Sequence, residues 1–390
     1  MISKNIKEKM LSGSMIRKMF EEGNRLRALH GAENVFDFSI GNPDLEPPQS
    51  VFSAISELAE NPTAGMHAYM SNSGYPSTRA AVAEKLQKES GVSISAENIC
   101  MTVGAAGALN AVLKSVLDPE DEVILLAPFF MEYVSYIQNA QGKPVILSTL
   151  ENGFLPNMED IKKAITPKTK AIIINSPNNP TGVIYDAAVL SELNACLLEA
   201  DHLIHVISDE PYIELTYDGV TPPVTLQHLK NLIVCYSWSK SLSLPGERIG
   251  YAAVSPNHED ALELSNAIVY CNRTLGSVNA PAFFQKVIEK NLYEKADISS
   301  YEKRRNLLYD IVTRAGFSCQ KPKGALYLFV KSPIDDLELS KVCAKQNLLI
   351  VPGSAFMGKG YFRLAFCVPE KMIKDSEKAF MAVGKELGLI

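Results

Sequence analysis

A lysine flanked by small hydroxyl residues is the strongest chemical feature of this 390-residue chain. Lys240 lies in the stretch SWSKSLS at 237–243, and Arg248 follows eight positions later. A lysine amine becomes a nucleophile toward a carbonyl carbon when burial and a neighbouring cation lower its pKa. The sequence therefore indicates covalent chemistry at a carbonyl or aldehyde group, with Lys240 as the nucleophile.

Two other segments supply what an aldehyde cofactor with a pyridine ring and a phosphate needs. Asp209 follows the apolar run 204–207, where a carboxylate could be buried and ionised against the ring nitrogen. Gly104-Ala105-Ala106 opens a helical segment, and the free N–H groups at a helix N-terminus bind phosphate. With Lys240, these residues predict a site for pyridoxal phosphate, held as an internal aldimine.

Each of these features also has a simpler interpretation. A Gly-x-x-Gly pattern before a helix is usually a tight turn, and a lysine in a serine-rich loop is usually solvated. The stretch NNPTG at 178–182 has the composition of a turn. Asp209-Glu210 could be a pair of metal ligands or a helix N-cap. The cofactor interpretation therefore rests on the joint arrangement rather than on any one residue.

Short apolar runs alternate with helical segments through the first two thirds of the chain. This pattern predicts an α/β domain with a mostly parallel sheet. One strand is expected to end near 103, and further strands are expected over 123–126, 144–147, 171–174, 203–207 and 232–234. The expected helices include 77–90, 107–117, 158–164 and 187–199. Ligands bind beyond the carboxyl ends of parallel strands, so the residues after these runs should meet at one edge of the sheet.

The last third of the chain has a different, α+β pattern. A long, mostly helical segment is expected over 268–312, followed by strands near 325–330 and 361–366 and helices over 337–346 and 370–387. We expect a large cofactor-binding domain over 45–285. A smaller, discontinuous domain should combine 1–44 with 286–390.

Composition narrows the class of protein further. The net charge of −6 argues against a general nucleic-acid binder, which carries a basic surplus. Seven cysteines and six histidines are scattered without metal-ligand spacing, so no metal site is expected and a reducing cytoplasm is the simpler location. The N-terminal 20 residues resemble an amphipathic helix rather than a signal peptide, and the strongest apolar run, 123–130, is too short to span a membrane.

Four motifs in fixed order carry a family resemblance. They are SPNNPTG at 176–182, SDEPY at 208–212, SWSK at 237–240 and RIGY at 248–251. In order and spacing they resemble the signature of the class I and II aminotransferases, the aspartate aminotransferase family, and the similarity extends from about 38 to 366. The resemblance implies the fold type I of pyridoxal-phosphate-dependent transferases. It also implies ping-pong transfer of an amino group from an L-amino acid to a 2-oxo acid.

The resemblance implies roles for the residues nearest the cofactor ring. Lys240 would form the aldimine and carry the proton between the substrate Cα and the cofactor C4′. Asp209 would pair with the ring N–H, while Tyr212 and Asn179 would hydrogen-bond the phenolic oxygen. Phe130 would stack on the ring, although a simple core position is its alternative.

Other residues would hold the phosphate and the substrate. Ser237, Arg248 and the backbone of Gly104, Ala105 and Ala106 would bind the phosphate, and Tyr69 would reach the phosphate of a partner subunit in a homodimer. On the substrate side, Arg363 would clamp the α-carboxylate, with Gly41 and Asn179 beside it. A structural ion pair is the alternative for Arg363, and Trp238 is expected in the core.

Ala106 departs from part of the family. Some aspartate-using relatives carry a lysine in the loop at 104–107 for the substrate's second carboxylate, and here the loop reads GAAG. This substitution argues against aspartate and leaves the amino donor open.

Three other functions remain as alternatives. A fold type I C–S lyase or related synthase would share Lys240, Asp209 and Arg363. A regulator with an N-terminal DNA-binding domain would need more than the 40 or so residues that precede the shared region. A nucleotide-binding dehydrogenase would need GxGxxG after the first strand, and the sequence has none there.

Overall fold

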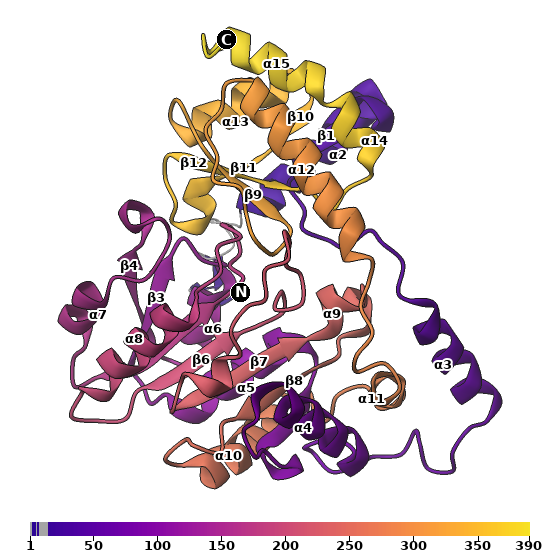
Figure 1. Cartoon of the computed structure of the whole chain (residues 1–390), viewed down its shortest axis with the longest axis vertical. Coiled ribbons are helices and arrows are strands. Elements are labelled where there is room, and N and C mark those ends of the chain that lie inside the picture. Colours follow the sequence, from indigo (N-terminus) through magenta and orange to yellow (C-terminus); the bar gives the residue numbers. More distant parts are fainter. Residues whose placement is uncertain (1, 5, 8–14) are drawn as a thin grey trace.

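The computed structural model describes residues 2–4, 6, 7 and 15–390, and its largest element is a seven-stranded sheet (Figure 1). The strands, in spatial order, are β2 (Ile99–Thr102), β8 (Gly250–Val254), β7 (Leu232–Ser237), β6 (His205–Asp209), β5 (Thr169–Asn175), β3 (Glu122–Ala127) and β4 (Lys143–Ser148). Six of these strands run in the same direction, and β8 runs opposite to them. The predicted mostly parallel α/β sheet is therefore confirmed.

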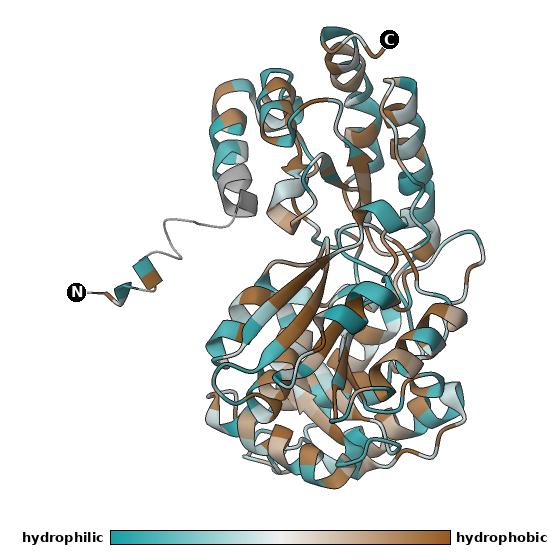
Figure 2. Ribbon diagram, turned by 90° about the vertical axis from the view of Figure 1, so that its left-hand side faces the viewer, coloured by the Kyte–Doolittle hydropathy of each residue, from teal (hydrophilic) through white to brown (hydrophobic). Residues whose placement is uncertain are grey.

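Helices cover both faces of this sheet, because successive strand side chains point to opposite sides. One face packs against α5 (Gly104–Val116), α6 (Glu132–Asn139) and α10 (Ala261–Thr274). The other packs against α4 (Pro76–Ser90), α7 (Met158–Ala164) and α8 (Ala187–Leu198), while α11 (Ala282–Glu289) packs on α4 and α3 (Gln49–Glu60) packs on α11. The strand interiors are mostly apolar, as Figure 2 shows in brown, and polar residues such as Asn175 and Asp209 lie at strand ends.

A second layer of structure lies above the carboxyl ends of the parallel strands (Figure 1). Its antiparallel sheet has the order β11 (Val351–Pro352), β12 (Tyr361–Ala365) and β9 (Tyr327–Lys331), and β1 (Phe36–Asp37) pairs with β10 (Leu348–Leu349). Its helices are α2 (Met15–His30), α12 (Ile298–Arg314), α13 (Asp336–Lys345), α14 (Glu370–Asp375) and α15 (Glu377–Glu386). In this layer, the pairing of β1 with β10 joins the N-terminal segment to the C-terminal part of the chain.

Short helical turns complete the connections. They are η1 (Ala32–Asn34), η2 (Ala96–Asn98), η3 (Leu150–Asn152), η4 (Thr225–Gln227), α9 (Trp238–Ser241), η5 (Pro245–Glu247) and η6 (Gly353–Phe356). Among the residues that the structure describes, no helix is both long and apolar enough to cross a membrane.

Several element boundaries differ from the sequence predictions. The helical segment expected over 268–312 is divided into α10, α11 and α12, because Gly276 takes a φ of +99° and Pro281 lies before α11. The helix expected from residue 107 begins at Gly104, and the one expected over 370–387 is interrupted at Ser376. The helix suggested for the first 20 residues falls partly on 1, 5 and 8–14, which lie outside the described residues.

Candidate active site

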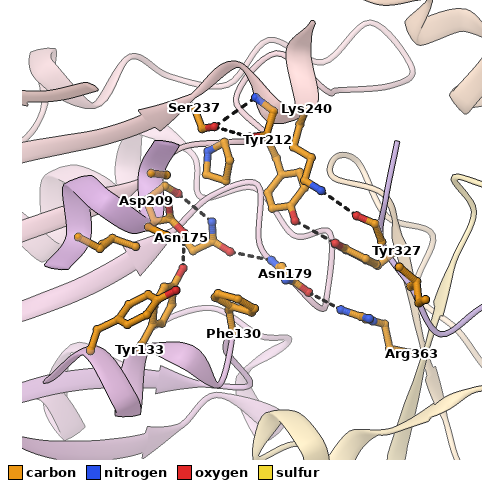
Figure 3. Close-up of a pocket in the computed structure, with 18 of the residues that line it drawn as sticks. Phe130, Tyr133, Asn175, Asn179, Asp209, Tyr212, Ser237, Lys240, Tyr327 and Arg363 are labelled. Carbon is orange, nitrogen blue, oxygen red and sulfur yellow. Dashed lines mark hydrogen bonds between the residues drawn. The ribbon is translucent and has the colours of Figure 1, made fainter. Parts of the chain in front are cut away.

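A cavity of about 290 Å³ opens where the parallel strands of the large sheet end. Figure 3 shows the side chains that converge on it from both layers of the molecule. It is lined by Ser39, Ile40, Gly41, Ala105, Ala106, Leu109, Phe130, Tyr133, Tyr136, Asn175, Asn179, Asp209, Pro211, Tyr212, Ser237, Ser239, Lys240, Arg248, Tyr327 and Arg363. All predicted site residues except Gly104 and Tyr69 are in this set.

Lys240 projects into the cavity from the short helix α9. The Ser237 hydroxyl caps this helix by accepting a hydrogen bond from the Ser239 N–H at 3.1 Å. The Lys240 Nζ donates to the carbonyl of Gly41 at 2.7 Å, across the gap between the two layers. Burial, assisted by Arg363 and Arg248, lowers the pKa of Lys240 to about 8, so a useful fraction of the amine is neutral near pH 7.5.

Asp209 ends strand β6 at the floor of the cavity. Its Oδ2 accepts a hydrogen bond from the Tyr133 hydroxyl at 2.5 Å, while its Oδ1 is buried with no hydrogen-bond partner among the described residues. Burial raises the pKa of Asp209 to about 7, the Tyr133 hydrogen bond opposes this rise, and Glu210 adds to it. An orphaned carboxylate oxygen facing a cavity is the acceptor that a protonated pyridine nitrogen requires.

Asn175 and Asn179 connect the strand ends. The Asn175 side chain donates to the Asp209 carbonyl at 2.8 Å and accepts from the Asn179 N–H at 2.7 Å. The Oδ1 of Asn179 in turn accepts from the Arg363 Nη1 at 3.1 Å. These bonds run as a chain from the floor of the cavity toward the second layer (Figure 3).

Arg363 enters the cavity from β12 and is 3% exposed. Its Nη1 and Nη2 donate to the Asn179 amide oxygen and, at 2.7 Å, to the Ser39 carbonyl, and its Nε has no partner among the described residues. Both acceptors are neutral. Among the described residues, Arg363 is therefore held by neutral hydrogen-bond acceptors and not by the structural ion pair that was its alternative role. A buried guanidinium with neutral acceptors retains the capacity to bind a ligand carboxylate.

The opposite end of the cavity is suited to a phosphate. The first turn of α5 begins at Gly104, which has a φ of +77°, and contains the backbone of Ala105 and Ala106. The exposed Arg248 donates to the carbonyls of Pro245 and Val103 at 3.0 and 3.2 Å. A Cβ at position 104 would lie 2.8 Å from the Arg248 Nη2, so glycine leaves room for that guanidinium.

The remaining predicted residues have contrasting positions. Phe130 lies half-buried in the cavity wall and is therefore accessible to a ligand. Its ring is edge-on to that of Tyr133, with the ring centroids 5.7 Å apart. Gly41 lines the cavity as well, whereas Trp238 packs in the core against Tyr236 and Tyr251, as expected. Tyr69 is 92% exposed and lies away from this cavity, in a surface hollow formed with 277–280 and 282.

Sequence reasoning assigned no role to several lining residues. Asn175 directly follows a predicted strand, so its place at the edge of the sheet could be predicted. Tyr133 lies at the start of α6, three residues after Phe130, which was itself predicted to line the site. Tyr327 reaches the cavity from the start of β9 and Ser39 from the irregular segment after β1, and no local sequence signal marks either residue. Within the described residues, no group of three or more His, Cys, Asp and Glu side chains could hold a metal ion.

The donor set fits pyridoxal phosphate by its chemistry. One cavity places an amine of lowered pKa, an orphaned carboxylate oxygen, a helix N-terminus with an arginine, and an aromatic wall around a single space. These groups match the aldehyde, ring nitrogen, phosphate and ring face of that cofactor.

Known proteins with similar sequence and structure support this assignment. The model of the family "Aminotransferase class I and II" matches residues 33–377. A probable aspartate/prephenate aminotransferase of Thermus aquaticus is 34% identical over 348 residues, covering 87% of this chain and 89% of that protein. Aromatic-amino-acid aminotransferase 2 of Thermococcus litoralis is 30% identical and covers 98% of both. A solved amino transferase of Eubacterium rectale superposes with a TM-score of 0.95 at 39% identity, covering 99% of both chains.

Proposed function

This chain belongs to the class I and II aminotransferases and is a pyridoxal-phosphate-dependent transaminase of fold type I, and we propose which of its residues perform the reaction. The observation that carries the proposal is the single cavity that joins Lys240, the orphaned Oδ1 of Asp209 and the buried Arg363. The reaction is a ping-pong transfer. An L-amino acid leaves as its 2-oxo acid, and a second 2-oxo acid then receives the amino group.

When bound, pyridoxal phosphate supplies an electron-withdrawing ring that stabilises negative charge at the substrate Cα. Lys240 would hold the cofactor covalently and, once released, its neutral Nζ would take the proton from the substrate Cα and deliver it to C4′. In the apoprotein, burial already lowers the pKa of Lys240 to about 8, which favours the neutral amine that accepts a proton. Asp209 would hold a proton on the ring nitrogen through its unpaired Oδ1, and Tyr212 and Asn179 would donate hydrogen bonds to the phenolic oxygen.

Arg363 orients the substrate. Its guanidinium is already fixed by Asn179 and the Ser39 carbonyl, so little side-chain entropy is lost when a carboxylate replaces one of these acceptors. Ser237, Arg248 and the N-terminal turn of α5 anchor the phosphate at the other end. A substrate held between the two ends would present its Cα to Lys240.

A division into two domains is part of the proposal. Residues 45–285 form the large domain, and 1–44 with 286–390 form the small one. The pairing of β1 with β10 and a separate apolar cluster around β9 and β12 support it. The cavity then lies between the domains, because Gly41 and Arg363 come from the small one.

A half-reaction screen tests the function and the substrate. Holoenzyme is mixed with single amino acids in a stopped-flow instrument, and loss of the visible cofactor band is followed with product analysis. We expect a 2-oxo acid and an enzyme-bound amino group, and no ammonia. Because Ala106 brings no cation to the cavity wall, we propose that aspartate is not the preferred donor. Free ammonia without any oxo-acid acceptor would instead identify the C–S lyase alternative.

We also propose a homodimer in which Tyr69 completes the partner's phosphate site. Its 92% exposure leaves the hydroxyl available to another subunit. Tyr69→Phe should weaken pyridoxal phosphate binding about 10- to 100-fold, the usual effect of one charge-assisted hydrogen bond, without changing the mass measured by sedimentation. Tyr293→Phe, at another exposed tyrosine, is the control. A monomeric holoenzyme with full cofactor affinity would contradict the proposal.

The proposed location is the cytoplasm. All seven cysteines are free thiols, and six of them are buried, which is the state expected in a reducing compartment.

A further inference from the structure

Tyr327 lies between two residues of the proposed machinery, and the roles above do not use it. It stands at the start of β9 and is 3% exposed. Its hydroxyl is 2.9 Å from the Tyr212 hydroxyl, and its ring lies under the Arg363 guanidinium, with the carbon Cζ 4.4 Å from the ring centroid. A Cβ at Gly41 would lie 2.1 Å from the same hydroxyl, so the irregular segment after β1 lies directly against it.

The number of hydroxyl protons decides the direction of this hydrogen bond. Each tyrosine has one O–H to donate, and its oxygen can accept. In the proposed function Tyr212 donates its proton to the phenolic oxygen of the cofactor. The 2.9 Å bond must then be donated by Tyr327 to the oxygen of Tyr212.

Donation by Tyr327 strengthens donation by Tyr212, because hydrogen bonds in a chain polarise one another. The guanidinium over the Tyr327 ring adds to this effect, since a cation favours negative charge on the phenol oxygen. A stronger bond to the phenolic oxygen favours the deprotonated form of the bound cofactor.

We propose that Tyr327 is a positioning residue that fixes Tyr212 as a donor to the cofactor and so lowers the pH at which the bound cofactor loses its proton. This inference rests on the roles of Lys240 and Tyr212 in the proposed function. It also connects the layer that holds the substrate to the chemistry of the ring, because Tyr327 and Arg363 lie on the paired strands β9 and β12.

Other charged and titratable groups face this pair of tyrosines. They are Arg363 and Cys367 around Tyr327, and Arg363, Asp209, Tyr133 and Lys240 around Tyr212. Replacing Tyr327 by phenylalanine removes one hydroxyl and leaves all of them in place, together with the ring under Arg363. The variant therefore isolates the hydrogen bond.

The test is a pH titration of the visible absorption of the holoenzyme. We expect Tyr327→Phe to raise the midpoint by about 0.2 to 0.5 pH unit, because only the cooperative part of the Tyr212 hydrogen bond, about 10–30% of it, is lost. Tyr212→Phe should raise it further. In a Tyr212→Phe background, Tyr327→Phe should have no additional effect, because Tyr327 acts through Tyr212.

Tyr361→Phe is the matched control, since Tyr361 lies on the adjacent strand β12 and stacks on Phe329 with ring centroids 5.0 Å apart, outside the cavity lining. Its midpoint should equal that of the wild type. An unchanged midpoint in Tyr327→Phe, or equal shifts in the wild-type and Tyr212→Phe backgrounds, would overturn the inference alone. A wild-type holoenzyme whose visible band does not titrate would overturn the proposed roles of Lys240 and Tyr212, and this inference with them.

Discussion

Lys240→Ala is expected to lose the covalent hold on pyridoxal phosphate and to lower turnover by at least about 10³-fold, within the range that general acid–base catalysis contributes. Lys240 is the one lysine among the described residues that line the cavity, so no other amine can replace it in attack or in proton transfer. The reaction of borohydride with holoenzyme, followed by peptide mass spectrometry, measures the first effect. Single-turnover kinetics measures the second.

Two controls separate lost chemistry from lost structure. Lys240→Arg keeps the positive charge but holds its proton too tightly to act as a base, so it should be as inactive as the alanine variant. A small primary amine should partly restore Cα proton transfer in Lys240→Ala, since the truncation leaves room in the cavity, and should not help Lys240→Arg. Normal turnover in Lys240→Ala would show that the base is elsewhere.

Most of the candidate site could be predicted because of where parallel strands end. Asn179, Asp209 and Ser237 follow or end three successive apolar runs, and hydrogen bonding between neighbouring parallel strands brings such ends together regardless of the loops. The periodicity of the buried strands and their turn residues is local information, so it can be read from one segment at a time. The turn at Gly104 that opens α5, where we propose that the phosphate binds, is local in the same sense.

The other half of the cavity depends on contacts between distant segments. Ser39 and Tyr327 are 288 residues apart (327 − 39), and both meet Arg363 only because β1 pairs with β10 and β9 with β12. Nothing in the composition of either segment specifies that pairing. The antiparallel strand β8 was not predicted for a related reason. Gly250 and two alanines give it a weak apolar signal in the sequence, and it is buried because β2 and β7 pair with it on both sides.

Asp209 also illustrates how an unpaired group marks a ligand site. Its carboxylate is buried at a cost in solvation, with one oxygen hydrogen-bonded by Tyr133 and the other without a partner. A protonated ring nitrogen would supply the missing hydrogen bond and the missing opposite charge together. In the proposed function, the cofactor would therefore stabilise an anion that burial destabilises in the apoprotein.

Asp209→Asn should lower turnover by about 10²- to 10³-fold or more while leaving the fold intact, because the amide matches the carboxylate in shape but carries no charge to hold a proton on the ring nitrogen. Weaker cofactor binding should accompany the loss. Single-turnover rates at saturating pyridoxal phosphate separate the two effects. Glu97→Gln, at an exposed acid in η2, is a matched control for loss of one negative charge.

The same variant should change how the stability of the apoprotein depends on pH. The pKa of Asp209 is about 7 in the folded protein and near 3.8 when unfolded, so between these values the folded state holds a proton that the unfolded chain has lost. Its contribution to the free energy of unfolding therefore falls as the pH rises from about 4 to 7, by at most about 1.4 kcal/mol per pH unit. Asp209→Asn removes this fall. In urea unfolding at pH 5, 6 and 7, the free energy of unfolding of the variant should therefore increase relative to that of the wild type at each step in pH. Parallel stability curves would mean that Asp209 is already ionised and paired without the cofactor.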